Sequence, residues 1–265
     1  MISFWKVLPV LRAELHRGRR VLVLSDFDGT LSSLTPRPKG ARISTRQRLV
    51  LGRLGREGFR LAVISGRELR DLRRRVALPG IVYGGNFGLE LMGPGFHFLH
   101  PGISGRRAAL AATWKQLLRL HRAFPKTVVE NKKWGVALHY RGLYHDFKRG
   151  EVRAFHAAVS RFRRAELAPG LRWERGAMAW EIFPDVGWDK GVAADVIWRR
   201  MDRPYMLAFG DAQTDDPLFD AVRGKGISVQ VGPGRKTTAT YWLPSVDEVY
   251  RALELLAPMR PSGRG

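Results

Sequence analysis

Short apolar segments that end in glycine or aspartate and lead into helical patterns recur at both ends of this chain. The apolar segments are residues 21–25, 59–65, 81–90, 205–211 and 226–232. The helical patterns that follow or separate them lie at about 43–57, 67–76, 189–201 and 214–222, with a last helix opened by the capping box Ser245-Val246-Asp247-Glu248. Strands that alternate with helices build parallel sheets covered on both faces. The two ends therefore predict one α/β domain with a doubly wound, Rossmann-like parallel sheet.

The middle of the chain has a different pattern. A helix is expected at about 106–123, followed by two strands in KTVVENKK and GVALHYR. A second helix has Val152, Phe155 and Val159 at helical spacing, and two more strands follow in LRWER and AMAWEIF. Helix, hairpin, helix, hairpin predicts a small α+β domain inserted into the larger one. We expect residues 1–103 and 186–265 to form the core domain and 104–185 the insertion.

Composition excludes several kinds of site. The chain has no cysteine, so disulfides, thiol nucleophiles and thiolate metal sites are excluded, and a metal would need oxygen or imidazole ligands. No apolar run approaches the roughly 20 residues of a membrane helix. Residues 1–20 predict an amphipathic first helix rather than a signal peptide, and residues 258–265 a frayed tail. We expect a cytoplasmic protein without membrane contacts.

Charge is the least ordinary property of the chain. Its 46 Lys and Arg against 24 Asp and Glu give +22. Such a balance favours phosphate, whether in nucleic acid, anionic lipid or a small substrate, but an arginine bias spread over solvated faces explains it equally well. The basic stretches are interrupted by apolar residues at helical spacing, so nucleic acid is not the favoured partner. We expect a monomer that acts on a small molecule.

The strongest local signal is LSDFDGTLS, in which an apolar strand leads into Asp26, Phe27 and Asp28. Side chains two residues apart share one side of a strand, so Asp26 and Asp28 can converge at its carboxyl end, where open α/β sheets bind ligands. An oxygen-preferring divalent cation such as Mg²⁺ would relieve their repulsion. The alternative is an ordinary Asp-Gly turn.

Three further elements have the same strand-to-helix context. Ser65 ends a strand before a helix, where a hydroxyl and free amides suit a phosphate oxygen, although such a serine is more often a cap. Lys190 begins a helix, where a lysine is more often a solvated surface residue. Asp211 ends a strand and is a better ligand candidate than Asp215, since acidic residues at a helix start are ordinary caps.

In order, these four elements resemble the motifs of the haloacid dehalogenase superfamily of phosphotransferases. The longer segments GNFGLE, VENKKWGVALHYR, AWEIFPDVGWDKG and FGDAQTDDPLF resemble those of trehalose-6-phosphate phosphatases. The resemblance extends over residues 21–255, and it implies a hydrolase core with an inserted cap domain.

The resemblance also implies roles. Asp26 would be the nucleophile that forms an aspartyl phosphate, and Asp28 would protonate the leaving sugar oxygen and later activate water. Ser65 and Lys190 would neutralise the transferring phosphoryl group. Mg²⁺ would be held by Asp26, the main-chain carbonyl of Asp28, and Asp211, with Asp215 supporting these ligands.

Substrate choice is expected in the cap. On the two predicted strands Glu130 and Lys132 share a face, as do His139 and Arg141. The family resemblance assigns disaccharide contacts to Glu130, Lys132, Arg141 and Glu181, whereas an exposed polar sheet face would explain any one of them. We expect His139 to orient its neighbours.

Three positions depart from the family pattern: Phe87 in place of a histidine, Ala212 in place of an aspartate and Asp216 in place of a glutamate. None removes a candidate nucleophile or metal ligand. The predicted function is a Mg²⁺-dependent phosphatase for trehalose 6-phosphate. The alternatives are a phosphatase for another sugar phosphate, such as sucrose phosphate or a glycosyl phosphoglycerate, or a polyanion-binding module on a phosphatase scaffold.

Overall fold

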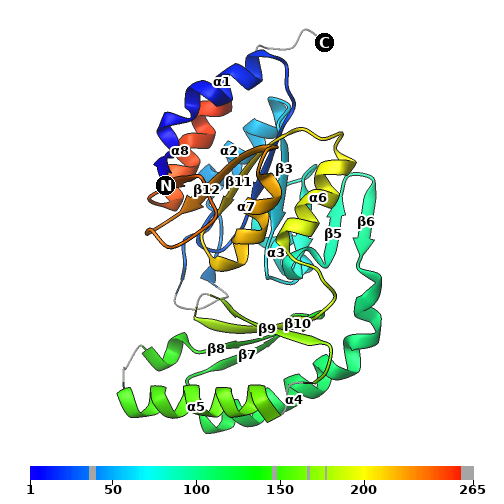
Figure 1. Ribbon diagram of the computed structural model, residues 1–265, viewed down its shortest axis with the longest axis vertical. Coiled ribbons are helices and arrows are strands. Elements are labelled where there is room, and N and C mark those ends of the chain that lie inside the picture. The colour runs from blue at the N-terminus through cyan, green and yellow to red at the C-terminus, as the bar shows by residue number, and fades with distance from the viewer. Residues whose placement is uncertain (36–39, 145–147, 166–167, 177, 258–265) are drawn as a thin grey trace. The chain divides into compact units, whose positions relative to one another are not determined.

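The chain has two compact units. The computed structural model describes residues 1–35, 40–144, 148–165, 168–176 and 178–257. One unit combines Met1–Phe98 with Trp188–Gly265, and the other is Leu99–Gly187 (Figure 1). The sequence-based assignment of residues 104–185 to a cap domain stays a prediction. In the described part of the chain, no helix has the length and apolar character to cross a membrane.

The first unit contains most of the strands and helices. Its strands are β1 (Ile2–Ser3), β2 (Val21–Ser25), β3 (Arg60–Ile64), β4 (Val82–Gly85), β5 (Glu90–Gly93), β6 (Phe96–Leu99), β11 (Tyr205–Gly210), β12 (Gly226–Val231) and β13 (Tyr241–Leu243). Its α-helices are α1 (Leu8–His16), α2 (Thr45–Arg56), α3 (Leu69–Val76), α6 (Lys190–Arg200), α7 (Asp216–Val222) and α8 (Val246–Leu256). Short 3₁₀ helices are η1 (Phe4–Lys6), η3 (Asn86–Gly88) and η6 (Gln213–Asp215).

These strands form one sheet in the order β1-β13-β12-β11-β2-β3-β4-β5-β6. The pairs from β1 to β4 are parallel, and β5 pairs with β4 in the antiparallel direction. The strand order places β11 directly beside β2, although about 180 residues separate them in the sequence. The expected doubly wound parallel sheet is confirmed.

Strand β2 shows why both faces of the sheet are covered. All five of its residues are buried. Val21 and Val23 belong to a core cluster that also contains side chains from α1, α2, α3 and α8. Leu22 and Leu24 alternate with them, are fully buried and lie outside that cluster, so they point to the opposite face. A strand that is buried on both faces has a nearly continuous apolar sequence, and VLVLS has this pattern.

The second unit is the predicted helix and hairpin pattern. It contains α4 (Arg107–Ala123), β7 (Val128–Asn131), β8 (Val136–His139), α5 (Arg149–Ala165), β9 (Leu171–Gly176) and β10 (Ala179–Pro184), with 3₁₀ helices η4 (Pro101–Arg106) and η5 (Arg141–Tyr144). The strands form an antiparallel sheet in the order β7-β8-β10-β9. Val136, Leu138 and Ile182 pack with apolar residues of α4 and α5, so the helices cover one face of this sheet.

The N-terminus differs from its expected form. The first helix begins only at Leu8, while Ile2–Ser3 pairs with β13 as an edge strand. Pro9 lies in the first turn of α1, where its missing N–H costs nothing, so the helix starts there. The expected frayed tail at 258–265 lies outside the described residues.

Candidate active site

Two neighbouring parallel strands deliver carboxylates to one end of the first unit's sheet. Asp26 directly follows β2, and Asp211 directly follows β11. The Asp26 N–H donates to the Phe209 carbonyl at 3.0 Å, which fixes the end of β2 against β11. Carboxylate oxygens of Asp26, Asp211 and Asp215 all lie within 4.8 Å of one another. The structure therefore brings together Asp26 and Asp211, which the family resemblance implies as ligands of one metal ion; their role as ligands stays a prediction.

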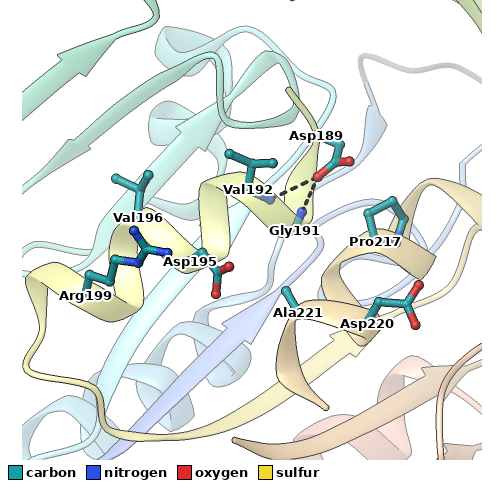
Figure 2. A pocket seen from close by; sticks show the side chains of 9 residues that line it. All are labelled: Asp189, Gly191, Val192, Asp195, Val196, Arg199, Pro217, Asp220 and Ala221. Carbon is teal, nitrogen blue, oxygen red and sulfur yellow. Dashed lines mark hydrogen bonds between the residues drawn. The ribbon is translucent and has the colours of Figure 1, made fainter. Parts of the chain in front are cut away.

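Lys190 enters this cluster from the start of α6. The Asp189 carboxylate accepts hydrogen bonds from the N–H groups of Gly191 and Val192 (Figure 2). Asp189 is thus the N-cap, and Lys190 is the first residue of the helix. Its Nζ donates to Asp26 at 2.6 Å and to Asp215 at 2.5 Å. The Lys190 side chain is only 2% exposed, so this lysine is not a solvated surface residue.

Burial and mutual repulsion shift the pKa values of the cluster. Burial raises the pKa of Asp26; Lys190 opposes the rise, and Asp215 adds to it. Burial also raises the pKa of Asp211, and the carboxylate of Asp26 raises it further. Burial alone would lower the pKa of Lys190, but Asp215 and Asp26 raise it above its ordinary value. If all three carboxyls were ionised, the cluster would carry more negative charge than one ammonium group neutralises.

Asp215 has its oxygens occupied by protein donors. One accepts from Lys190, and the other accepts from the N–H groups of Asp211 at 3.0 Å and Ala212 at 2.9 Å. The latter two bonds hold the backbone that carries Asp211. The Ala212 departure leaves this bond intact, because only its backbone is used. This geometry agrees with the expectation that Asp215 supports the other ligands.

Gly29 makes room for Asp211. Its φ of +85° lies in the left-handed region, and a Cβ at this position would lie 2.0 Å from an oxygen of Asp211. The glycine of the Asp-Gly-Thr motif is therefore required twice, by its backbone conformation and by this close approach.

The Asp28 carboxylate is held by an arginine. Nε and Nη2 of Arg67 donate to its two oxygens at 2.7 and 2.6 Å. Burial alone would lower the pKa of Arg67, but Asp28 and Asp71 raise it above its ordinary value. The sequence presents Arg67 only as part of a strand-to-helix turn and shows no reason to pair it with Asp28.

Ser65 lies at the end of β3, next to β2, and is buried. Its hydroxyl accepts from the Arg67 N–H at 3.2 Å, and its carbonyl accepts from the Phe87 N–H at 2.8 Å. The ring of Phe87 fills the space beside Gly66, where a Cβ would lie 2.8 Å from the ring. Phe87 therefore helps to shape the turn that carries Ser65.

The core residues fit a divalent cation. Three carboxylates converge, those of Asp26 and Asp215 buried and that of Asp211 partly buried. The pKa values of Asp26 and Asp211 are raised, and a cation between the carboxylates would relieve their repulsion. The set contains only oxygen ligands, which Mg²⁺ prefers. A metal site at this position is compatible with the residues present.

The candidate sugar-binding residues lie in the second unit. Glu130 and Glu181 are both directly opposite Ala137, one across β7 and β8 and the other across β8 and β10. They share the face opposite the one that α4 and α5 cover, because Val136 and Leu138 alternate with Ala137. The sequence did not predict that Glu130 and Glu181 lie on either side of Ala137 across three neighbouring strands.

Two ion pairs hold side chains on the sheet face that carries Glu130 and Glu181. Lys132 Nζ donates to both oxygens of Glu181 at 2.9 and 2.7 Å, and the Lys132 side chain is only 6% exposed. His139 Nε2 lies 2.8 Å from Glu130. Lys132 directly follows the end of β7, and its bonds to Glu181 place its ammonium on the face that Glu130 shares, as alternation predicts. Arg141 lies in η5 and not in the expected strand. The predicted sugar contacts of Glu130, Lys132, Arg141 and Glu181 stay a prediction.

A groove of about 530 Å³ lies between α6 and α7 (Figure 2). Its nine lining residues include Asp189 and Gly191, the neighbours of Lys190, but none of the candidate catalytic or metal-binding side chains. It is separate from the carboxylate cluster.

A sequence model described as trehalose-phosphatase matches residues 24–247. The chain belongs to the trehalose-phosphatase family. It is 35% identical over 261 residues to a trehalose-phosphate phosphatase of Mycobacterium avium, with 94% of this chain and 65% of that protein covered. An uncharacterized glycosyl hydrolase of Mycobacterium tuberculosis is 36% identical over 92% of this chain but only 19% of its own length. The chain thus spans less than two thirds of these curated relatives.

Solved structures share the fold. The C-terminal domain of a Candida albicans trehalose-6-phosphate phosphatase has a TM-score of 0.76 and 20% identity, covering 94% of this chain and 96% of that one. A haloacid dehalogenase-like hydrolase from Bacteroides thetaiotaomicron has a TM-score of 0.61 and 17% identity, covering 90% of this chain and 100% of that one. The core-plus-insert architecture expected from the family resemblance is confirmed.

Proposed function

We propose that this chain is a phosphatase that hydrolyses trehalose 6-phosphate to trehalose and inorganic phosphate. The observation that carries the proposal is the buried contact of Lys190 with Asp26, beside Asp211, in a member of the trehalose-phosphatase family. Phosphoryl transfer through an aspartate requires a nucleophilic carboxylate, a positive charge for the phosphoryl group and a second carboxylate. Asp26, Lys190 and Asp211 would supply these groups at the carboxyl ends of β2 and β11.

In the first step an Asp26 oxygen attacks phosphorus. The bond from phosphorus to the sugar oxygen breaks, and that oxygen keeps the electron pair and takes a proton from Asp28. In the second step Asp28 takes a proton from water while the water oxygen attacks phosphorus. The bond from phosphorus to Asp26 then breaks and phosphate leaves. Lys190 lies at the nucleophile throughout and would offset the charge on the phosphoryl oxygens, with Ser65 as a hydroxyl donor.

Mg²⁺ would be held by Asp26, the Asp28 carbonyl and Asp211, and would supply charge neutralisation at the phosphoryl group. In the second unit Glu130, Lys132, Arg141 and Glu181 would bind the sugar hydroxyls. Glu181 and Lys132 support this role, because their ion pair is ordered on a sheet face that α4 and α5 leave uncovered. We also expect a cytoplasmic monomer.

The test is phosphate release by purified protein from trehalose 6-phosphate, sucrose 6-phosphate, glucose 6-phosphate and p-nitrophenyl phosphate. We expect the highest kcat/KM on trehalose 6-phosphate, loss of activity in EDTA and recovery with Mg²⁺. Asp26→Asn should reduce release to background, because an amide cannot form the acyl phosphate.

The matched control is Asp195→Asn, the same change in α6 at a residue that pairs with Lys225 outside the cluster. It should keep wild-type activity. Near-wild-type release by Asp26→Asn would refute the nucleophile, and a clear preference for sucrose 6-phosphate would refute the substrate.

A further inference from the structure

Arg67 lies between two carboxylates. Its Nε and Nη2 hold both oxygens of Asp28, while Nη1 donates to Asp71 at 3.0 Å. The Arg67 side chain is 8% exposed, and its guanidinium carbon lies 5.4 Å from the centre of the Phe27 ring. A buried guanidinium with three directed bonds cannot turn without breaking all of them.

The backbone of Arg67 is fixed as well. Its N–H donates to the Ser65 hydroxyl, and its carbonyl accepts from the Asn86 N–H at 2.7 Å. Asp71, one helical turn further on, accepts in addition from Arg75 at 2.6 Å. The Arg67 residue that binds Asp28 is therefore held by Asp71 through its side chain and by Ser65 and Asn86 through its backbone.

Asp28 itself is less confined. Its side chain is 33% exposed, and an aspartate at this exposure is free to change rotamer unless a partner holds it. Proton transfer needs the carboxyl oxygen within hydrogen-bond reach of the leaving oxygen, so its orientation decides its effect.

We infer that Arg67, braced by Asp71, is a positioning residue that fixes the Asp28 carboxylate for proton transfer. The inference deepens the proposed function and rests on it for the role of Asp28. Arg67 acts only through Asp28 and neither gains nor loses a proton. Asp28 enters the first step as the protonated acid and gives its proton to the leaving oxygen; Arg67 stabilises the carboxylate that this transfer produces, and that carboxylate takes a proton from water in the second step.

Leaving-group dependence distinguishes this role from a structural one. Phenyl phosphate and p-nitrophenyl phosphate have a similar shape, but phenolate is the poorer leaving group and needs the proton more. The parameter kcat/KM reports the steps through transfer to Asp26, so slow hydrolysis of the aspartyl phosphate does not mask the effect.

The main variant is Arg67→Lys, which keeps the positive charge but cannot form the fork to both oxygens. Its kcat/KM on phenyl phosphate should fall about 10- to 100-fold, with a much smaller fall on p-nitrophenyl phosphate. Asp71→Asn should give a weaker loss in the same direction. The control Arg74→Lys changes another arginine that contacts Asp71, one that is 70% exposed, and should leave the ratio of the two esters unchanged.

A double-mutant cycle with Asp28→Asn gives the second measurement. If Arg67 acts through Asp28, Arg67→Lys should add almost nothing to the loss already caused by Asp28→Asn. Should Arg67→Lys fail to fold in a thermal melt, Asp71→Asn carries the same comparison.

Equal losses on both esters, additive losses in the cycle, or the same change in Arg74→Lys would overturn the inference. Wild-type protein that hydrolyses the aryl esters but not trehalose 6-phosphate would refute only the proposed substrate. Wild-type protein that releases phosphate from none of these esters would refute the proposed function and this inference together.

Discussion

Replacing Lys190 by methionine should destabilise the metal-free protein strongly. The substitution keeps most of the side-chain volume but removes the ammonium that contacts Asp26 at 2.6 Å and Asp215 at 2.5 Å. Breaking a buried ion pair by removing one partner costs about 3–5 kcal/mol. Each kcal/mol lowers Tm by about 2–4 °C in a domain of this size, so we expect a fall of roughly 6–20 °C.

The loss should depend on pH in a defined direction. The pKa of Asp26 rises on folding from 3.8 to about 7, so its contribution to stability is fully present below its ordinary pKa and is lost as pH rises through the folded value. Lys190 opposes this rise. Without it the loss extends to higher pH, and the Tm deficit of Lys190→Met in EDTA should be larger at pH 8 than at pH 5.

Divalent metal should recover part of the deficit. A cation that binds only the folded protein stabilises it by mass action, and the variant has one positive charge fewer beside the site. Saturating Mg²⁺ should therefore raise the Tm of Lys190→Met more than that of the wild type. Thermal melts followed by circular dichroism, with EDTA or with MgCl₂, measure both effects.

The control is Lys225→Met, which removes another lysine–aspartate pair, with Asp195, whose side chains are 30% and 33% exposed. Pairs of this exposure contribute at most about 1 kcal/mol, so its Tm should fall by a few degrees at most, in EDTA and in Mg²⁺ alike. Equal Tm values for Lys190→Met and Lys225→Met in EDTA, or identical Mg²⁺ responses, would refute this account of the cluster.

Three further outcomes are expected. Gly29→Ala should weaken Mg²⁺ binding in calorimetry and lower Tm by several degrees, because its left-handed backbone costs an alanine about 1–2 kcal/mol and its Cβ displaces the carboxylate of Asp211; unchanged metal affinity would contradict this. Glu130→Ala and Glu181→Ala should each lower kcat/KM for trehalose 6-phosphate by about 10- to 100-fold, with little effect on p-nitrophenyl phosphate, since charge-assisted bonds to sugar hydroxyls contribute roughly 1.5–3 kcal/mol each; equal losses on both esters would indicate a role in folding. If the +22 charge steers a dianionic substrate to the protein, kcat/KM should fall as salt is added. Phosphate release measured at limiting substrate from low to high ionic strength tests this, and a constant kcat/KM would contradict it.

The candidate site residues that directly follow strands were predictable from sequence. Asp26, Ser65 and Asp211 each follow an apolar run directly, and parallel strands present their carboxyl ends at one edge, so their proximity follows from the pattern. The edge strand β1 and its neighbour β13 have only two and three residues. Runs this short carry no periodicity and could not be recognised.

Partners brought together by the fold were not predictable in the same way. Arg67 and Asp28 are 39 residues apart, and Lys132 and Glu181 are 49 apart. One arginine among many in a basic chain gives no signal of which carboxylate it meets. The alternation argument failed at Arg141, because β8 ends at His139 and a 3₁₀ helix follows. At Lys132 the strand also ends one residue early, but the side chain still pairs with Glu181 on the face that Glu130 shares.

Charge at the proposed reaction centre has the opposite sign from the whole chain. Asp26, Asp28, Asp211 and Asp215 are acidic there, against Lys190 and Arg67, so the group is negative when every carboxyl is ionised. One divalent cation would neutralise it without leaving a surplus for the substrate. A phosphate dianion then needs cations from beyond this group, and the segment 104–185 alone carries 17 Lys and Arg against 7 Asp and Glu. The excess of basic residues would then attract a phosphorylated substrate to a proposed nucleophile that itself lies among acids.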